Sequence, residues 1–120
     1  ILGESIFDLE GREYSMAGIL PFKSKKGNLK IGYRESISKN KSPITTPGNI
    51  QIGHEFHRWE IINENYNSEI KPLWDLKGWN IAIKNEGFCN HLIHASWIHL
   101  HWASSPEIIK NWKRSVISSA

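Results

Sequence analysis

Two histidines, His99 and His101, lie one residue apart in the stretch WIHLHW, residues 97–102. In a β-strand alternate side chains share a face, so Trp97, His99 and His101 are expected on one side of the strand. Two imidazoles on one surface suit three uses: a metal site, a general base with a neighbour, or polar groups satisfied inside a core. Which of these three uses applies depends on the strands and helices that position the side chains.

A second cluster, GHEFH at residues 53–57, adds two more histidines and a carboxylate. If this stretch is extended, His54 lies on one face and Glu55 and His57 lie on the other. In a metal site, the two later histidines would supply two ligands and His54 or Glu55 a third. In the other interpretation the cluster belongs to a sheet core, where His57 and His101 are partly buried and hydrogen-bonded.

The single cysteine, Cys89, excludes an internal disulfide and a zinc site made of several thiolates. It suits a reducing compartment, so the cytoplasm is expected. A histidine at the end of a strand could activate a thiol. An ordinary strand at about 3.3 Å per residue would, however, place Cys89 roughly 20 Å from His99. We therefore expect Cys89 to be inert, and a cysteine served by His99 would lie outside this chain.

The composition of the 120 residues, 39% hydrophobic and 22% charged, is that of a globular domain or part of one. No apolar run approaches the roughly 20 residues of a membrane span, so no membrane partner is expected. The net charge is +3, and the lysines between residues 23 and 41 cluster among loop-forming residues. They form no helical stripe and do not alternate with aromatic residues, which argues against nucleic-acid binding. The start has no initiator Met and no signal peptide, which predicts a chain that begins in mid-domain.

Alternating and apolar runs predict five strands separated by segments rich in turn-forming residues. The predicted strands are 14–20, 29–35, 50–62, 79–84 and 92–98, with a turn at 23–27 and the end of a helix or a turn at 6–9. Ser105, Pro106 and Glu107 are typical of a helix start, and an apolar stripe follows. A histidine between the last strand and this helix has the usual position of a catalytic residue in an open α/β sheet.

Four motifs in order, MAGILPF (16–22), GYRE (32–35), GHEFH (53–57) and ASWIHLHW (95–102), cover nearly the whole chain. Together they resemble the carboxyl-terminal glutamine amidotransferase domain of the cobyrinic acid a,c-diamide synthase family. The resemblance implies an open mixed α/β sheet of the class I glutamine amidotransferase type, with residues 1–120 as the carboxyl-terminal portion of that domain and no second domain. In that family a Gly-Cys-Gly-Gly nucleophile turn would lie just before Ile1, and an amino-terminal ATP-binding synthetase domain would lie further upstream.

The resemblance also assigns roles to the motif residues. His99 matches the histidine that activates the nucleophilic cysteine, and His101 stands where many such enzymes carry the carboxylate of a triad. Residues lining the glutamine pocket would be Gly53, His54, Glu55 and His57, with His101 beside them. For the GYRE motif, a salt bridge, a domain contact and a substrate contact all remain open.

The activity implied by the resemblance is amidation of the a and c acetate carboxylates of cobyrinate, with glutamine as the nitrogen donor. ATP and Mg²⁺ would act in the synthetase domain, and no cofactor is expected in this chain. Glutamine, cobyrinate and the synthetase domain would be the partners, and the isolated chain would be inactive. The rival hypothesis from the residues alone is a histidine-rich metal-binding or non-enzymatic module.

Overall fold

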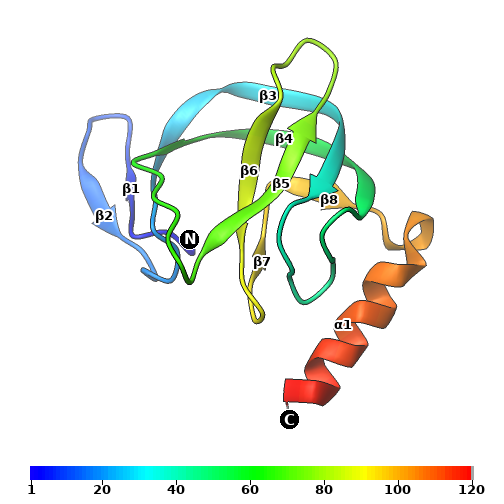
Figure 1. Ribbon diagram of the computed structural model, residues 1–120. Coiled ribbons are helices and arrows are strands. Elements are labelled where there is room, and N and C mark those ends of the chain that lie inside the picture. Colours follow the sequence, from blue (N-terminus) through cyan, green and yellow to red (C-terminus); the bar gives the residue numbers. More distant parts are fainter. Residues whose placement is uncertain (120) are drawn as a thin grey trace.

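Two long antiparallel strands, β3 (Lys23–Ser38) and β4 (Ile50–Ile62), form the centre of the sheet. They pair from Lys23 opposite Ile62 to Ile37 opposite Ile50. The computed structural model, which describes residues 1–119, is shown in Figure 1. The strand predicted at 50–62 is confirmed, because its alternating side chains bury one face and expose the other.

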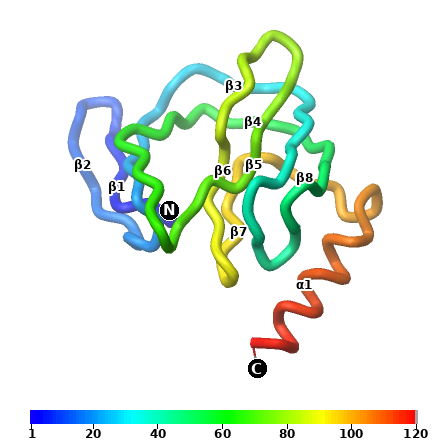
Figure 2. The backbone as a smooth tube through the Cα atoms, in the orientation of Figure 1, coloured from blue at the N-terminus to red at the C-terminus, as the bar shows by residue number. Residues whose placement is uncertain are grey.

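The remaining strands extend the sheet from both edges of this pair. One edge of β3 is shared by β1 (Ser5–Phe7), which is parallel to it, and β5 (Lys71–Lys77), which is antiparallel. The outer strands are β2 (Glu13–Ser15) beside β1, β6 (Lys84–Cys89) beside β5, β7 (His94–Ala95) beside β6 and β8 (Ile98–Leu100) beside β4. The sheet is therefore mixed and open, as predicted, and it curves strongly along its length (Figure 2).

The turn predicted at 23–27 is wrong, because β3 runs through this segment as a continuous strand. Gly27 and Asn28, residues that are common in turns, instead lie in a β-bulge, where the register with β4 shifts between Lys26 and Lys30. A Cβ on Gly27 would meet the Glu60 side chain at 2.3 Å, so a larger residue in the bulge would require that side chain to move.

The strand predicted at 79–84 is also wrong, because this segment is the loop of the β5–β6 hairpin. Trp79 is 90% exposed and Asn80 has a positive φ of 58°. The strands lie on either side of the loop, where Leu73, Trp74 and Leu76 are completely buried.

Two further predicted strands are shorter than expected, and the amino-terminal segment differs as well. Only Glu13–Ser15 of the first region is a strand, and the residues after it hydrogen-bond back to residues 1–4. The predicted strand 92–98 is split into β7 and β8, because Ser96 and Trp97 turn to bind a buried carboxylate described below. In the segment 6–9, expected to be the end of a helix or a turn, residues 6 and 7 belong to β1 and residue 9 lies in the turn that follows.

The helix predicted after Ser105 is confirmed as α1 (Pro106–Ser119), preceded by a short 3-10 helix at Trp102–Ser104. Only Ile108 of its apolar stripe is buried, so most of this face is exposed. The helix projects from one end of the sheet (Figure 1). Within residues 1–119, no helix is long and apolar enough to cross a membrane.

The core lies on the concave face of the sheet, which we call the inner face. Two clusters of buried side chains fill it, one around Leu20, Ile70 and Phe88 and the other around Leu73, Trp74 and Cys89. The opposite, outer face carries several exposed apolar side chains.

Candidate functional site

The GHEFH stretch lies within β4, and alternation along this strand divides the predicted site residues between two faces of the sheet. Gly53, Glu55 and His57 are buried on the inner face. His54 lies on the outer face, directly opposite His99 of β8. The structure therefore brings His54 and His99 together and separates both from Glu55 and His57.

His54 and His99 belong to a row of ring side chains across the outer face. Tyr33 of β3 is the register partner of His54, and their ring centroids are 5.4 Å apart in an edge-on arrangement. His54 and His99 are directly opposed in the register of β4 and β8, so their side chains start from neighbouring positions on the outer face, with Cβ atoms expected about 4.5–5.5 Å apart. His99 is exposed, and no side chain among residues 1–119 hydrogen-bonds its imidazole. Its ring nitrogens are accordingly open to a reacting group.

Apolar side chains surround this row on the outer face. Ile31, Ile52 and Phe56 are each more than half exposed, and the Phe56 ring is stacked with His54 at 6.4 Å. Proteins rarely leave a contiguous apolar surface open to water unless it contacts something. His99 therefore sits in a surface suited to contact with further polypeptide or with a substrate.

Gly53 holds β8 against β4. A Cβ at this position would meet the Ile98 side chain at 2.3 Å and the His99 carbonyl oxygen at 2.9 Å. Glycine is therefore required for the close approach of the two strands. Gly53 thus contributes to the site by positioning the strand that carries His99.

Glu55 is the centre of a buried charged cluster on the inner face. Its carboxylate accepts a hydrogen bond from Arg34 Nε at 2.7 Å, and its other oxygen lies 2.9 Å from His57 Nε2. Burial alone would raise the pKa of Glu55, but the hydrogen bonds with Arg34 and His57 outweigh it and lower this pKa. Arg34 of the GYRE motif therefore makes a buried salt bridge, one of the uses that the sequence left open.

Trp97 does not share a face with His99, which corrects the expectation from strand alternation. Its ring packs on the buried His57 imidazole, with centroids 4.1 Å apart. The reason is that β8 begins only at Ile98, so the alternation of the strand does not extend back to Trp97.

His101 lies just after β8 and is exposed. Its carbonyl oxygen accepts hydrogen bonds from the Ser104 N–H at 3.1 Å and the Ser104 hydroxyl at 2.7 Å, which begins the 3-10 helix. The backbone of His101 thus makes the transition from strand to helix. Its side chain has no hydrogen-bond partner among residues 1–119, so the structure does not join it to His99.

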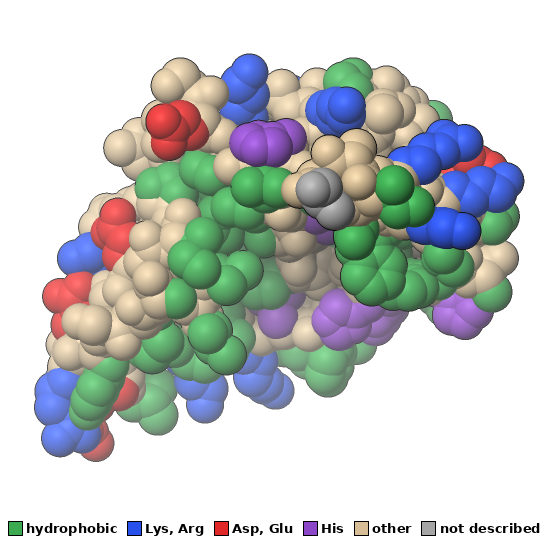
Figure 3. Space-filling view, turned by 90° about the horizontal axis from the view of Figure 1, so that it is seen from below, with side chains coloured by type: hydrophobic (Ala, Val, Ile, Leu, Met, Phe, Trp, Pro, Cys, Tyr) green, Lys and Arg blue, Asp and Glu red, His purple; other side chains and the backbone are tan. Residues whose placement is uncertain are grey.

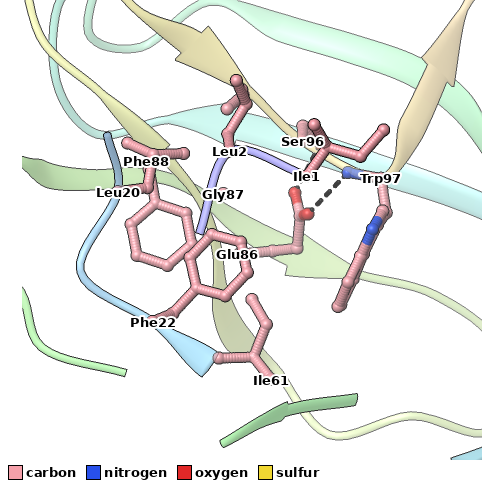
Figure 4. Close-up of a pocket in the computed structure, with 11 residues that line it drawn as sticks. Ile1, Leu2, Leu20, Phe22, Ile61, Glu86, Gly87, Phe88, Ser96 and Trp97 are labelled. Atoms are coloured by element: carbon pink, nitrogen blue, oxygen red, sulfur yellow. Dashed lines mark hydrogen bonds between the residues drawn. The ribbon is translucent and has the colours of Figure 1, made fainter. Parts of the chain in front are cut away.

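Glu86, which the sequence analysis missed, is a buried carboxyl group on β6. It accepts hydrogen bonds from the Ser96 hydroxyl at 2.6 Å and the Trp97 N–H at 2.9 Å. Burial raises the pKa of Glu86 despite these hydrogen bonds. Figure 4 shows it between the rings of Phe22 and Trp97, at the wall of a small cavity of about 150 Å³. Glu86 lies among residues typical of turns, so the sequence analysis assigned it to a loop. Nothing in the sequence indicated that it is buried.

A larger cavity of about 560 Å³ links the two buried acids on the inner face. Glu55, His57, Glu86 and Trp97 all line it. The predicted pocket residues Glu55 and His57 therefore do line a cavity, but it opens on the face opposite to His99.

The metal hypothesis finds no support in this arrangement. Glu55, one proposed third ligand, faces away from His54 and His99. Across residues 1–119, no three His, Cys, Asp or Glu side chains are grouped so that they could hold a metal ion.

Cys89 is completely buried at the end of β6, with its Sγ 3.7 Å from the Pro72 carbonyl oxygen. Burial raises the pKa of its thiol to about 11. These observations agree with the expectation that Cys89 is inert.

We expect the Cys89 thiol to react with Ellman's reagent at pH 8 at least about 100-fold more slowly in the native protein than in denaturant, because reaction requires an accessible thiolate. Absorbance of the released thionitrobenzoate measures both rates. Reaction of the native protein at the rate of an unfolded thiol would show that Cys89 is reactive.

His94, also missed as a special residue, is half-buried between Ser42 and Trp74. Its Nδ1 lies 2.9 Å from Ser42 Oγ, and its ring meets the Trp74 ring edge-on at 5.0 Å. Ser42 Oγ also accepts two backbone N–H groups and lies 3.0 Å from Thr45 Oγ1, so His94 shares this hydroxyl with several partners. Burial lowers the pKa of His94 to about 4.

His94 is therefore expected to make the protein less stable in acid. Its pKa in the folded state lies below the ordinary 6.5, so the unfolded chain takes up the proton first as the pH falls. The free energy of unfolding should decrease by roughly 2 to 3 kcal/mol between pH 6.5 and about pH 4 from this residue. Urea denaturation at several pH values measures it, and His94→Gln should flatten this part of the profile. An unchanged slope in His94→Gln would contradict the assignment.

Comparison with known proteins identifies the family to which the chain belongs. The chain belongs to the CobB/CobQ-like glutamine amidotransferase domain family, whose sequence model matches residues 1–107. It is 32% identical to the cobyrinate a,c-diamide synthase of a Synechococcus strain over 113 residues, and 32% identical to that of Priestia megaterium over 114 residues. Each alignment covers 92% of this chain and 24% of the relative. The hydrogenobyrinate a,c-diamide synthase of Streptomyces coelicolor is 29% identical over 81% of this chain.

The chain thus spans about a quarter of the length of the curated relatives that it matches. The predicted family resemblance is confirmed, and the chain is part of a family of amidotransferase enzymes.

Proposed function

We propose that this chain supplies the general acid–base histidine, His99, to the glutaminase site of an enzyme that amidates cobyrinate or hydrogenobyrinate. The observation that carries the proposal is the exposed His99 on β8, paired across the sheet with His54 at the transition from strand to helix. Membership of the amidotransferase family supplies the chemical context. We also propose that the open sheet is the carboxyl-terminal portion of a domain of the class I type.

In this proposal, a cysteine from polypeptide outside residues 1–120 attacks the side-chain amide carbon of glutamine. His99 takes the thiol proton as the carbon–sulfur bond forms, and backbone amides stabilise the oxyanion. His99 then protonates the leaving nitrogen, so ammonia departs as the carbon–nitrogen bond breaks. Water hydrolyses the resulting thioester to glutamate and restores the thiol.

The apolar outer face around His99 supports this proposal, because its exposed side chains offer a surface on which the part that carries the cysteine could dock. The greater length of the relatives is consistent with such further polypeptide.

ATP and Mg²⁺ belong, in this proposal, to a synthetase domain that activates the a and c acetate carboxylates. The described residues do not fit an Mg²⁺ site of their own, since they lack a cluster of carboxylates or histidines. In this proposal the ATP-dependent steps therefore take place in the synthetase domain.

The experiment that tests the proposal is an amidation assay on the full-length enzyme that contains residues 1–120. With cobyrinate, ATP, Mg²⁺ and glutamine, mass spectrometry should detect the a,c-diamide, and hydrogenobyrinate provides the parallel assay. The isolated chain should release no glutamate from glutamine. Failure of the full-length enzyme to amidate either substrate, with glutamine or with ammonia, would overturn the proposal.

A further inference from the structure

A groove separates α1 from the body of the protein, and His99 and its neighbours are not among the residues that line it. One part is a cavity of about 400 Å³ between the 41–46 segment, the turn before β7 and the second half of α1. Lys41, His91 and Arg114 line this part, and none of the described residues that line it is acidic. Neither Lys41 nor Arg114 makes a salt bridge with an acid of residues 1–119. Their charges are thus available to a ligand.

The wall of this cavity is fixed by hydrogen bonds. Ser42 Oγ accepts the N–H groups of Ile44 and Thr45 at 3.3 and 3.1 Å, which closes a tight turn. Asn111 Nδ2 donates to the Ile44 carbonyl oxygen at 3.1 Å and so ties α1 to the turn. The cationic groups therefore surround a preformed space.

The groove continues into an apolar part. A second cavity of about 320 Å³ shares His91 and Ser115 with the first and adds Leu92, Trp112 and Val116. These three apolar side chains are 63%, 47% and 57% exposed, respectively. Trp112 is held edge-on against Trp102 at 5.5 Å. Figure 3 views the molecule from this end and shows cationic and apolar side chains next to one another.

We propose that this groove binds a phosphate ester with an apolar or aromatic body. Two cationic side chains, Lys41 and Arg114, with no acid among the described lining residues match the negative charge of a phosphate, and a guanidinium such as Arg114 can bind phosphate oxygens in pairs. The body of the ligand packs on Trp112, Leu92 and Val116. This site does not depend on the function proposed above, because it shares no residue with the row around His99.

The test is isothermal titration calorimetry at constant ionic strength with three probes: inorganic phosphate, phenyl phosphate and phenol. Phenyl phosphate should bind at least about tenfold more tightly than inorganic phosphate, because only it fills both parts of the groove, and phenol should not bind measurably. Absence of saturable binding by phenyl phosphate would overturn the proposal.

Four variants separate a site from a general effect of charge. Arg114→Ala and Lys41→Ala should each weaken binding of both phosphates at least about tenfold, the loss expected for a charge-assisted contact. Trp112→Ala should weaken phenyl phosphate alone. Lys113→Ala is the matched control, since it removes the same charge from the same helix without lining the groove, and it should have less than a twofold effect. Equal losses in Lys113→Ala and Arg114→Ala would contradict the proposal. Circular dichroism checks folding, and Arg114→Gln replaces Arg114→Ala if the latter unfolds.

Discussion

Replacing Arg34 by methionine should lower the free energy of unfolding by about 3 to 5 kcal/mol, because it leaves the buried Glu55 carboxylate without its cationic partner. The side chains of Arg34 and Glu55 are only 6% and 3% exposed, so the lost ion pair is far less screened by water than a surface pair would be. Methionine retains much of the apolar volume of the arginine side chain, so the loss of stability should come mainly from the missing charge and hydrogen bonds. The substitution also removes a hydrogen bond to the Tyr33 carbonyl oxygen at 3.0 Å.

Urea denaturation followed by circular dichroism measures this loss. Arg12→Met is the matched control, since Arg12 pairs with Asp8 on the surface and its side chain is 67% exposed. It should change stability little. Adding Glu55→Gln to Arg34→Met should recover part of the stability by removing the orphaned charge. If Arg34→Met costs no more than Arg12→Met, the buried salt bridge is not a major determinant of stability.

The strand β4 and the helix α1 could be predicted because each carries its signal locally. In β4 buried and exposed side chains alternate, and Ser105 precedes α1, which begins with Pro106 and Glu107. The hairpin of β5 and β6 could not be predicted, since Pro72 and Asp75 in one strand and Gly87 in the other resemble loop residues. These strands form because tertiary packing completely buries Leu73, Trp74 and Leu76, which no local pattern shows.

The candidate site was only partly predictable for a similar reason. Spacing within GHEFH correctly divides His54 from Glu55 and His57, because alternation is a local property of a strand. That His54 lies opposite His99 depends on the register between β4 and β8, two strands far apart in the chain. The burial of Glu86 depends on contacts from Ser96 and Trp97, so no property of its own neighbours in sequence indicates it.

Replacing His99 by alanine in the full-length enzyme should lower glutamine-dependent amidation by a factor of about 100 or more. This is the effect expected when a general acid–base group is lost. Synthesis from added ammonia should be retained, because ammonia is already a nucleophile and needs no proton transfer by the glutaminase site. Because the His99 side chain is exposed, the substitution should leave the fold intact, and circular dichroism checks this.

His101→Ala is the matched control, since it removes an exposed imidazole two residues away. A small effect is expected, because its side chain has no hydrogen-bond partner among residues 1–119. A loss equal to that of His99→Ala would instead make His101 a working member of the site.

The most direct test of the central claim is the ratio of glutamine-dependent to ammonia-dependent amidation, measured with the same preparation of the His99→Ala enzyme. Both rates follow from the appearance of the diamide by mass spectrometry, with ATP and the carboxylate substrate saturating. The role assigned to His99 predicts that this ratio falls about 100-fold or more while the ammonia-dependent rate stays at the level of the unmodified enzyme. An unchanged ratio, with both rates lowered equally in a folded protein, would contradict it.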